Sequence, residues 1–221
     1  LELAKANASS GLTDADGVMV IAWEATCDAW TVQQRIRLNL RTTQGDMLET
    51  DTGFTSWETI DGTEYRFNAR TYRNGHLDEE LKGGAQIDER DGSGEAVYSQ
   101  PEGLSITLPP GSVFPTIHTV ELIEAARSGE ITFFRVIFDG ATREGAAELN
   151  AVISQMIPAT QSDPADPMLD RDGWPMRLAY FNLGDQAEEP DYELGIVLLD
   201  NGVATELNME YGDFTIAATL E

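Results

Sequence analysis

Residues 35–41 read Arg35-Ile36-Arg37-Leu38-Asn39-Leu40-Arg41, with apolar and polar side chains exchanging at every step. The segment Glu64–Arg70 repeats this alternation. Successive side chains of a β-strand point to opposite faces of its sheet, so each run gives one apolar face and one polar face. Such alternation is typical of antiparallel sheets that cover a core with one face. The two runs therefore predict a mainly β protein.

Turn signals separate further strand-like segments along most of the chain. Asp61-Gly62, Asn74-Gly75 and Asp200-Asn201-Gly202 contain residues that tolerate positive φ, and each lies between two alternating or apolar segments. Turns of this kind join antiparallel strands that are neighbours in sequence. We therefore expect one antiparallel sheet, without the βαβ crevices in which many cofactors bind.

One segment departs from the strand pattern and predicts an α-helix from Ile117 to Arg127. Thr116 offers an N-cap hydroxyl, and Gly129 lies where a glycine commonly ends a helix. We expect the apolar stripe of this helix to pack into the concave face of the sheet; the stripe consists of Ile117, Val120, Leu122 and Ile123.

A proline- and aspartate-rich segment, residues 158–175, predicts a long surface loop. A linker between two domains is the alternative. The strands that follow the segment are too few to bury a core by themselves, so we predict a single domain over residues 1–221.

The charge balance is strongly acidic, with 39 Asp and Glu against 14 Lys and Arg and a net charge of −25. Such a surface repels phosphate backbones and anionic lipid headgroups, which argues against nucleic-acid partners and electrostatic membrane docking. No apolar run is long enough to predict a transmembrane segment. The first residue is Leu1 rather than methionine, so removal of an export signal and truncation are both open.

The chain offers little patterned chemistry. Its single cysteine, Cys27, is either a small buried apolar residue or half of a disulfide with a partner outside the sequence. His76 and His118 lack metal-ligand spacing, and His118 is expected to be structural. The Asp-x-Asp-Gly segments at 14–17 and 170–173 fail the EF-hand pattern and predict turns. We predict no catalytic residues, no metal site and no cofactor.

Aromatic side chains gather on neighbouring predicted strands and allow two interpretations. Packing into the core is one, and lining a concave face that holds an acyl chain or a peptide is the other. The residues concerned are Trp23, Trp30, Phe54, Trp57, Tyr65, Phe67 and Tyr72.

Several short motifs, taken in order, resemble one family. They are Leu1-x-Leu3-x-x-Ala6 with Ser10-Gly11, Gly17-Val18-Met19 leading to Cys27 and Trp30, Gly62-x-x-Tyr65-Arg66-Phe67 with Tyr72, Phe114-Pro115-Thr116-x-His118-x-x-Glu121-Leu122-Ile123, Trp174-Pro175 with Tyr180-Phe181, and Met209-Glu210-Tyr211-Gly212-Asp213-Phe214. Together they span the chain and resemble the cell envelope integrity EipB family, periplasmic proteins of alphaproteobacteria.

The resemblance implies a single antiparallel β-spiral or broken β-barrel that encloses one central α-helix. It also implies export to the periplasm, a role in cell envelope integrity, and a protein partner of helical-repeat type. Similar folds bind acyl chains or peptides. In the family pattern, the cysteine corresponding to Cys27 pairs with a second one close to the C-terminus, and this sequence contains no second cysteine.

The function expected from these observations is non-enzymatic support of the cell envelope, through a protein partner or a hydrophobic ligand. A lipid or lipoprotein carrier or sensor with a half-barrel pocket is one alternative, and it needs a cavity beside the helix. A carbohydrate-active enzyme is the other, and it needs two carboxylates that face one cleft.

Overall fold

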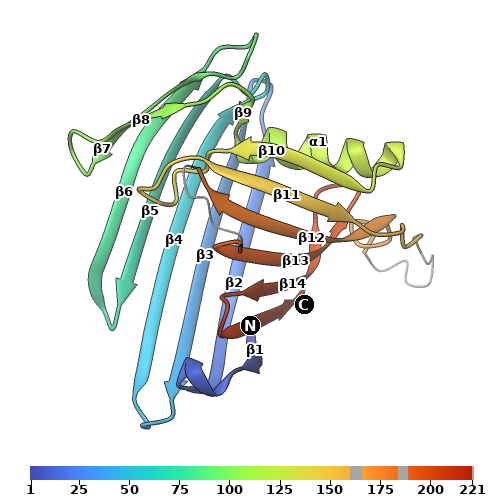
Figure 1. Ribbon diagram of the computed structural model, residues 1–221. Coiled ribbons are helices and arrows are strands. Elements are labelled where there is room, and N and C mark those ends of the chain that lie inside the picture. Colours follow the sequence, from blue (N-terminus) through green and yellow to red (C-terminus); the bar gives the residue numbers. More distant parts are fainter. Residues whose placement is uncertain (160–165, 184–188, 221) are drawn as a thin grey trace.

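The computed structural model describes residues 1–159, 166–183 and 189–220, which form fifteen strands and one α-helix (Figure 1). The first eight strands are β1 (Glu2–Ala6), β2 (Leu12–Ala25), β3 (Ala29–Thr42), β4 (Met47–Thr59), β5 (Glu64–Arg73), β6 (His76–Ile87), β7 (Gly94–Gln100) and β8 (Ser105–Leu108). The short strand β9 (Ser112–Val113) precedes the helix α1 (Pro115–Ser128). The chain continues with β10 (Thr132–Ile137), β11 (Ala147–Ile153), β12 (Gly173–Asn182), β13 (Tyr192–Leu199), β14 (Ala204–Glu210) and β15 (Phe214–Thr219).

All of these strands belong to one sheet, in the order β8-β7-β6-β5-β4-β3-β2-β1-β15-β14-β13-β12-β11-β10-β9. The first and last strands, β1 and β15, therefore pair with each other inside the sheet, while the two free edges come from the middle of the chain. Neighbouring strands are antiparallel except β9 and β10, which are parallel. The predicted fold class, a mainly β broken barrel with one helix, is confirmed.

The barrel has two unequal walls (Figure 1). Strands β2–β6 contain 10 to 14 residues each, whereas β10–β15 contain 6 to 10. Figure 1 shows the long strands running steeply while the shorter ones cross them, with α1 beside β10. We call the face of the sheet that carries the core clusters the inner face, and the opposite face the outer face.

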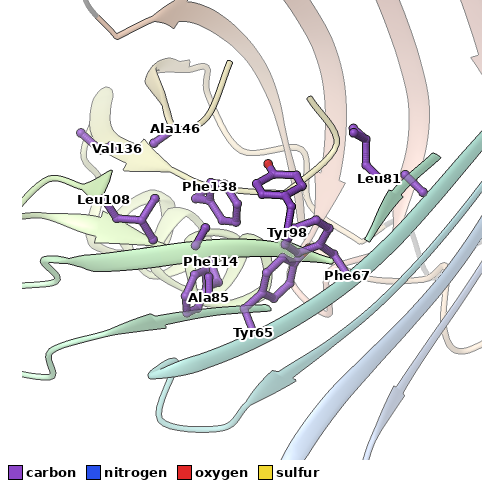
Figure 2. Packing of buried hydrophobic residues seen from close by; sticks show 12 residues of the cluster. Tyr65, Phe67, Leu81, Ala85, Tyr98, Leu108, Phe114, Val136, Phe138 and Ala146 are labelled. Carbon is purple, nitrogen blue, oxygen red and sulfur yellow. The ribbon is translucent and has the colours of Figure 1, made fainter. Parts of the chain in front are cut away.

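An aromatic cluster joins the two walls at one end (Figure 2). Tyr65 and Phe67 of β5 pack against Phe114, Phe138 and Tyr98, with ring centroids 4.9 to 6.4 Å apart. The segment after β10 is held over these rings, because the Tyr65 hydroxyl donates to the Asp139 carbonyl at 2.9 Å. The Tyr98 hydroxyl likewise donates to the Thr142 carbonyl at 2.8 Å. Buried aromatic packing and two satisfied hydroxyls thus fix this end of the barrel.

A second cluster attaches the helix to the short wall. Leu122, Ile123 and Ala126 of α1 pack among apolar side chains of β10–β13. A third cluster lies where the chain ends meet, and it centres on Ala15, Met209 and Ile216. The core is therefore spread over three clusters of one continuous sheet.

The predicted end of the long surface loop needs correction. The proline-rich segment 158–175 is not a loop to its end, because Gly173, Trp174 and Pro175 already belong to β12; residues 160–165 lie outside the described part. The nitrogen and the carbonyl of Pro175 both face the end of β11. The strand tolerates the missing N–H there, and the Pro175 carbonyl still accepts a hydrogen bond from the Ser154 amide at 2.9 Å.

Among the described residues, no helix has the length and apolar character that crossing a membrane requires.

Candidate functional site

A buried carboxylate marks the end of the barrel where the helix begins. Glu58 is only 1% exposed, and its two carboxylate oxygens accept hydrogen bonds from the amides of Thr116 at 2.8 Å and Ile117 at 2.9 Å. Burial raises the pKa of Glu58, and the two amide hydrogen bonds oppose the rise. A carboxylate at this position satisfies amides that the helix itself leaves unpaired and complements the positive end of the helix dipole.

This arrangement corrects the predicted helix start. The helix begins at Pro115, its N-cap is Phe114, and no N-cap side chain accepts a hydrogen bond. The capping function that we expected from the Thr116 hydroxyl is therefore supplied by Glu58 of β4. Sequence reasoning missed Glu58, although it occupies an inner-face position of an alternating strand, where a carboxylate needs a partner.

His118 lies in the first turn of the helix and is 4% exposed. Its ring meets Phe133 edge-on with 5.6 Å between centroids, and its Nε2 has no hydrogen-bond partner among the described residues. Burial, with a smaller contribution from Arg135, lowers the pKa of His118 to about 4. The imidazole is therefore neutral at neutral pH and packs as part of the core.

A surface hollow of about 420 Å³ opens beside this helix end. It lies between residues 61–63, 87–92 and 110–113, with Glu121 and Arg135 at its side. Three aspartates line it, and each accepts hydrogen bonds from residues of its own turn: Asp61 from Thr59 and Thr63, Asp88 from Arg90, and Asp91 from Ser93. These contacts lower the pKa of all three carboxyls. Within the described ranges, no group of three His, Cys, Asp or Glu side chains could hold a metal ion.

A second hollow, of about 450 Å³, lies on the outer face of β2–β5. Gly53 lies directly between Arg35 and Arg70 in the strand register, and there is open space above its Cα. Each arginine is paired with a carboxylate, Arg35 with Asp51 and Arg70 with Glu80, both at 2.7 Å. The arginine contacts lower the pKa of Asp51. This hollow presents fixed charges of both signs on a rigid strand surface.

The residues singled out from the sequence are dispersed in the structure. Cys27 is exposed and lies between β2 and β3, far in sequence from the helix. Leu122 and Ile123 are buried, Ile117 is half-buried against Gly62, and Val120 is 37% exposed. The buried face of the helix also includes Thr116, His118 and Ala126. The stripe chosen by apolar character thus shares Leu122 and Ile123 with the face that the helix buries, whereas Val120 lies outside that face.

Comparison with known proteins gives one consistent result. Residues 1–221 match the EipB-like family. The cell envelope integrity protein EipB of Brucella abortus (strain 2308) is 28% identical over 225 residues, which cover 100% of this chain and 79% of that protein. A solved beta-barrel-like protein of a domain of unknown function, also from Brucella abortus, has a TM-score of 0.90 and 26% identity, covering 100% of this chain and 92% of that one. The resemblance inferred from the sequence motifs is confirmed.

Proposed function

Because this chain belongs to the EipB-like family, we propose that it is a periplasmic protein that helps to keep the cell envelope intact by binding a protein partner. The observation that carries the proposal is the family match over the whole length of the chain. The relative from Brucella abortus is named for cell envelope integrity, and its alignment leaves no part of this chain uncovered.

Binding rather than catalysis is supported by how the acidic groups are used. A carbohydrate-active site needs one carboxyl group with a raised pKa as a proton donor and a second one across the same cleft. Asp61, Asp88 and Asp91 line one hollow, but their pKa values are lowered by hydrogen bonds within their own turns. Burial raises the pKa of Glu58 and of Asp139, yet both oxygens of Glu58 bind helix amides, and the Asp139 carboxylate accepts a hydrogen bond from the Ala141 amide of its own turn.

A protein partner is favoured over an acyl chain by the lining of the two hollows. Pockets that hold apolar molecules enclose most of the ligand and carry few charged side chains. Both hollows open at the surface and carry charged side chains, including Arg35, Asp51 and Arg70 in one and Asp61 and Arg135 in the other. Burying those charges against a hydrocarbon chain would be costly. A polar protein surface can pair with them.

The envelope role is tested by deleting the gene in its own host and challenging the cells with detergent and with cell-wall antibiotics. We expect increased sensitivity, restored by the wild-type gene, and recovery of the protein with the periplasmic fraction after osmotic shock. Unchanged sensitivity to every challenge would overturn the envelope role. Recovery with the cytoplasm would overturn the location.

The mode of action is tested by native mass spectrometry of protein purified from the periplasm, compared with its denatured mass. We expect the bare protein mass, or a complex with another polypeptide. A non-covalent adduct of lipid mass that disappears on denaturation would overturn the protein-partner proposal and favour the lipid carrier or sensor.

A further inference from the structure

One glycine in the long wall of the barrel has no structural reason to be glycine. The described strands contain seven glycines, and at six of them an added Cβ would lie 1.9 to 3.4 Å from another atom. At Gly53, in the middle of β4, nothing lies within 4 Å, and the φ of this residue is not in the left-handed range. Glycine weakens a strand and often marks a place where a ligand or another chain approaches closely.

The hollow over Gly53 lies within a patch of basic side chains. We call the outer face of residues 31–37, 51–57, 66–72 and 80–84, on the neighbouring strands β3–β6, the arginine patch. Its basic residues are Arg35, Arg37, Arg66, Arg70 and Lys82, and its acidic residues are Asp51 and Glu80. The patch therefore has a net charge of +3 in a protein with a net charge of −25.

The patch presents mainly guanidinium groups to the solvent. The side chains of Arg35, Arg37 and Arg70 are 57%, 55% and 51% exposed, whereas those of their partners Asp51 and Glu80 are 19% and 27% exposed. Arg35 binds Asp51 through Nε and Nη2, and Arg70 binds Glu80 through the same two nitrogens. A guanidinium has five N–H donors. The other donors of these two arginines have no acceptor among the described residues, so they are available to a ligand.

The outer face of the short wall has the opposite charge balance. Arg177 of β12 is shared by Glu193 and Glu210, both at 2.9 Å. In the arginine patch, one carboxylate is shared by two arginines, because Asp51 lies 2.7 Å from Arg35 and 3.0 Å from Arg37. Excess positive charge is thus a property of the long wall.

Basic residues without an acidic partner also gather on this wall. Among the described residues, four of the 14 Lys and Arg form no ion pair. One is Lys5, and the other three lie on the outer face of β3, β5 and β6, namely Arg41, Arg66 and Lys82. Arg66 lies over the ring of Trp57, 4.8 Å from its centroid. The uncompensated positive charge therefore lies in and beside the arginine patch.

We propose that the arginine patch binds an acidic segment of a partner protein, with one carboxylate of that segment over Gly53, between Arg35 and Arg70. The proposal rests on the proposed protein-binding function and names the surface and the chemistry of the partner. Guanidinium groups bind carboxylates through paired, charge-assisted hydrogen bonds, and arginine clusters recur where proteins recognise acidic motifs. Because ion pairs already hold Arg35 and Arg70 in place, little side-chain freedom is lost on binding.

The size of the patch and the charge around it favour a short acidic segment over other anions. Four strands about 4.8 Å apart and four rows of outer-face residues about 6.8 Å apart make a surface of about 15 by 20 Å. A long polyanion such as nucleic acid would extend beyond this surface and be repelled by the acidic remainder of the protein. Two copies of the chain also repel each other, since each has a net charge of −25.

NMR titration with the synthetic peptide Gly-Glu-Asp-Glu-Tyr-Glu-Asp-Glu-Gly tests the surface. We expect saturable shifts of the Gly53 amide and of the Nε–H signals of Arg35 and Arg70. A peptide with Gln and Asn in place of Glu and Asp should cause none. Affinity should fall as the salt concentration rises from about 0.1 M to about 1 M, because the screening length falls from about 10 Å to about 3 Å. No saturable shift of these signals, or equal binding of the neutral peptide, would overturn the proposal.

A matched pair of arginine variants separates the patch from ion pairing in general. Arg70→Gln and Arg177→Gln each remove an arginine that is about half exposed and paired with a carboxylate across strands. We expect peptide affinity to fall about tenfold in Arg70→Gln, because charge-assisted hydrogen bonds are lost. Affinity should stay at the wild-type value in Arg177→Gln. Equal affinities in the two variants would overturn the proposal.

Filling the hollow makes the test independent of any loss of stability. Gly53→Val adds a better strand former where space is open, so the melting temperature should be kept or raised. Peptide affinity should fall about tenfold, because the new side chain keeps the carboxylate away from the arginines. Gly195→Val, on the outer face of the short wall, is the control and should leave affinity unchanged. A folded Gly53→Val protein that binds the peptide as the wild type does would overturn the proposal.

Two other occupants would be recognised by the same measurements. If inorganic phosphate shifts the Arg35 and Arg70 signals at lower concentration than the peptide does, the patch is a site for small anions and the proposal fails. A wild-type dimer in analytical ultracentrifugation that Arg70→Gln dissociates would identify a second copy of the chain as the occupant, which also overturns the proposal.

The two proposals can fail separately. If the Gly53→Val gene restores envelope resistance although its protein no longer binds the peptide, the patch is not the functional surface and the envelope role stands. If deletion of the gene has no effect on the envelope while the wild-type protein binds the peptide, the envelope role fails and the patch remains a binding site.

Discussion

Replacing Gly140 by alanine tests how tightly the segment after β10 is packed over the aromatic cluster. Gly140 has φ = +69°, and a Cβ there would lie 2.4 to 2.6 Å from three ring atoms of Phe67. That ring cannot simply turn aside, because the rings of Tyr98, Phe138 and Tyr65 surround it with centroids 5.0, 5.7 and 5.9 Å away. Either the ring or the loop backbone must therefore move.

The expected loss of stability has two parts. Left-handed backbone costs an alanine about 1–2 kcal/mol, and the reduced freedom of the unfolded chain returns about 0.4–1 kcal/mol. Forcing an extra methyl group into a packed core costs about 1–3 kcal/mol. We therefore expect Gly140→Ala to lower the free energy of unfolding by about 1–5 kcal/mol in urea denaturation, with an unchanged dependence on urea concentration.

Gly75→Ala is the matched control. Gly75 has φ = +78° and nothing within 4 Å of a Cβ, so this change carries the net backbone cost alone, about 0–2 kcal/mol. Combining Gly140→Ala with Phe67→Leu should cost less than the sum of the two single changes, because the smaller side chain relieves the contact. Equal losses for Gly140→Ala and Gly75→Ala would refute the reasoning.

Three further changes probe the helix and its surroundings. Glu58→Ala leaves two buried amides without acceptors and should lower the free energy of unfolding by about 2–5 kcal/mol in urea denaturation, and Glu58→Gln, which keeps one acceptor oxygen, should cost less. The folded protein holds His118 neutral, so protonation of this residue favours the unfolded chain. Up to about 3 kcal/mol of stability should therefore be lost as the pH falls from 6.5 to about 4. His118→Phe should flatten this part of a stability–pH curve. Leu122→Asp places a charge in the core and should unfold or loosen the domain, with a large fall in melting temperature.

Each of these changes has an outcome that would contradict it. A Glu58→Gln protein as unstable as Glu58→Ala would show that the carboxylate does not act as a pair of acceptors. The exposed His76 provides the control for the pH dependence. If His76→Asn changes the stability–pH curve as much as His118→Phe does, surface charge and not the buried His118 causes the pH dependence. Val120→Asp, at a position 37% exposed, should leave the melting temperature nearly unchanged, and equal losses for Val120→Asp and Leu122→Asp would contradict the observed orientation of the helix.

The features that could be predicted from the sequence are those set by local chemistry. The turns at Asp61-Gly62, Asn74-Gly75 and Asp200-Asn201-Gly202 join consecutive strands as expected, because a tight turn depends on the φ preferences of its own residues. Gly129 ends the helix in the left-handed conformation for the same reason.

The features that escaped prediction depend on contacts between distant residues. Glu58 caps a helix 58 residues further along the chain, and no local pattern records that distance. The helix buries His118, Leu122 and Ala126, which follow the i, i+4 spacing of one helical face. Choosing positions by apolar character alone passed over His118 and included Val120. The contacts of the helix with the sheet decide which helix face is buried, so side-chain polarity alone does not determine the orientation of the helix.

The pairing of β1 with β15 has a consequence for how the molecule is completed during synthesis. Ser9 and Asp213, hydrogen-bonded beside this joint, are 204 residues apart in sequence. Most other strand pairs join consecutive strands and can form as the chain emerges, whereas closing so long a loop is slow. Strand β1 must therefore wait, with one edge unpaired, until β15 has been synthesised, and a chain cut short before β15 would lack the partner that β1 needs.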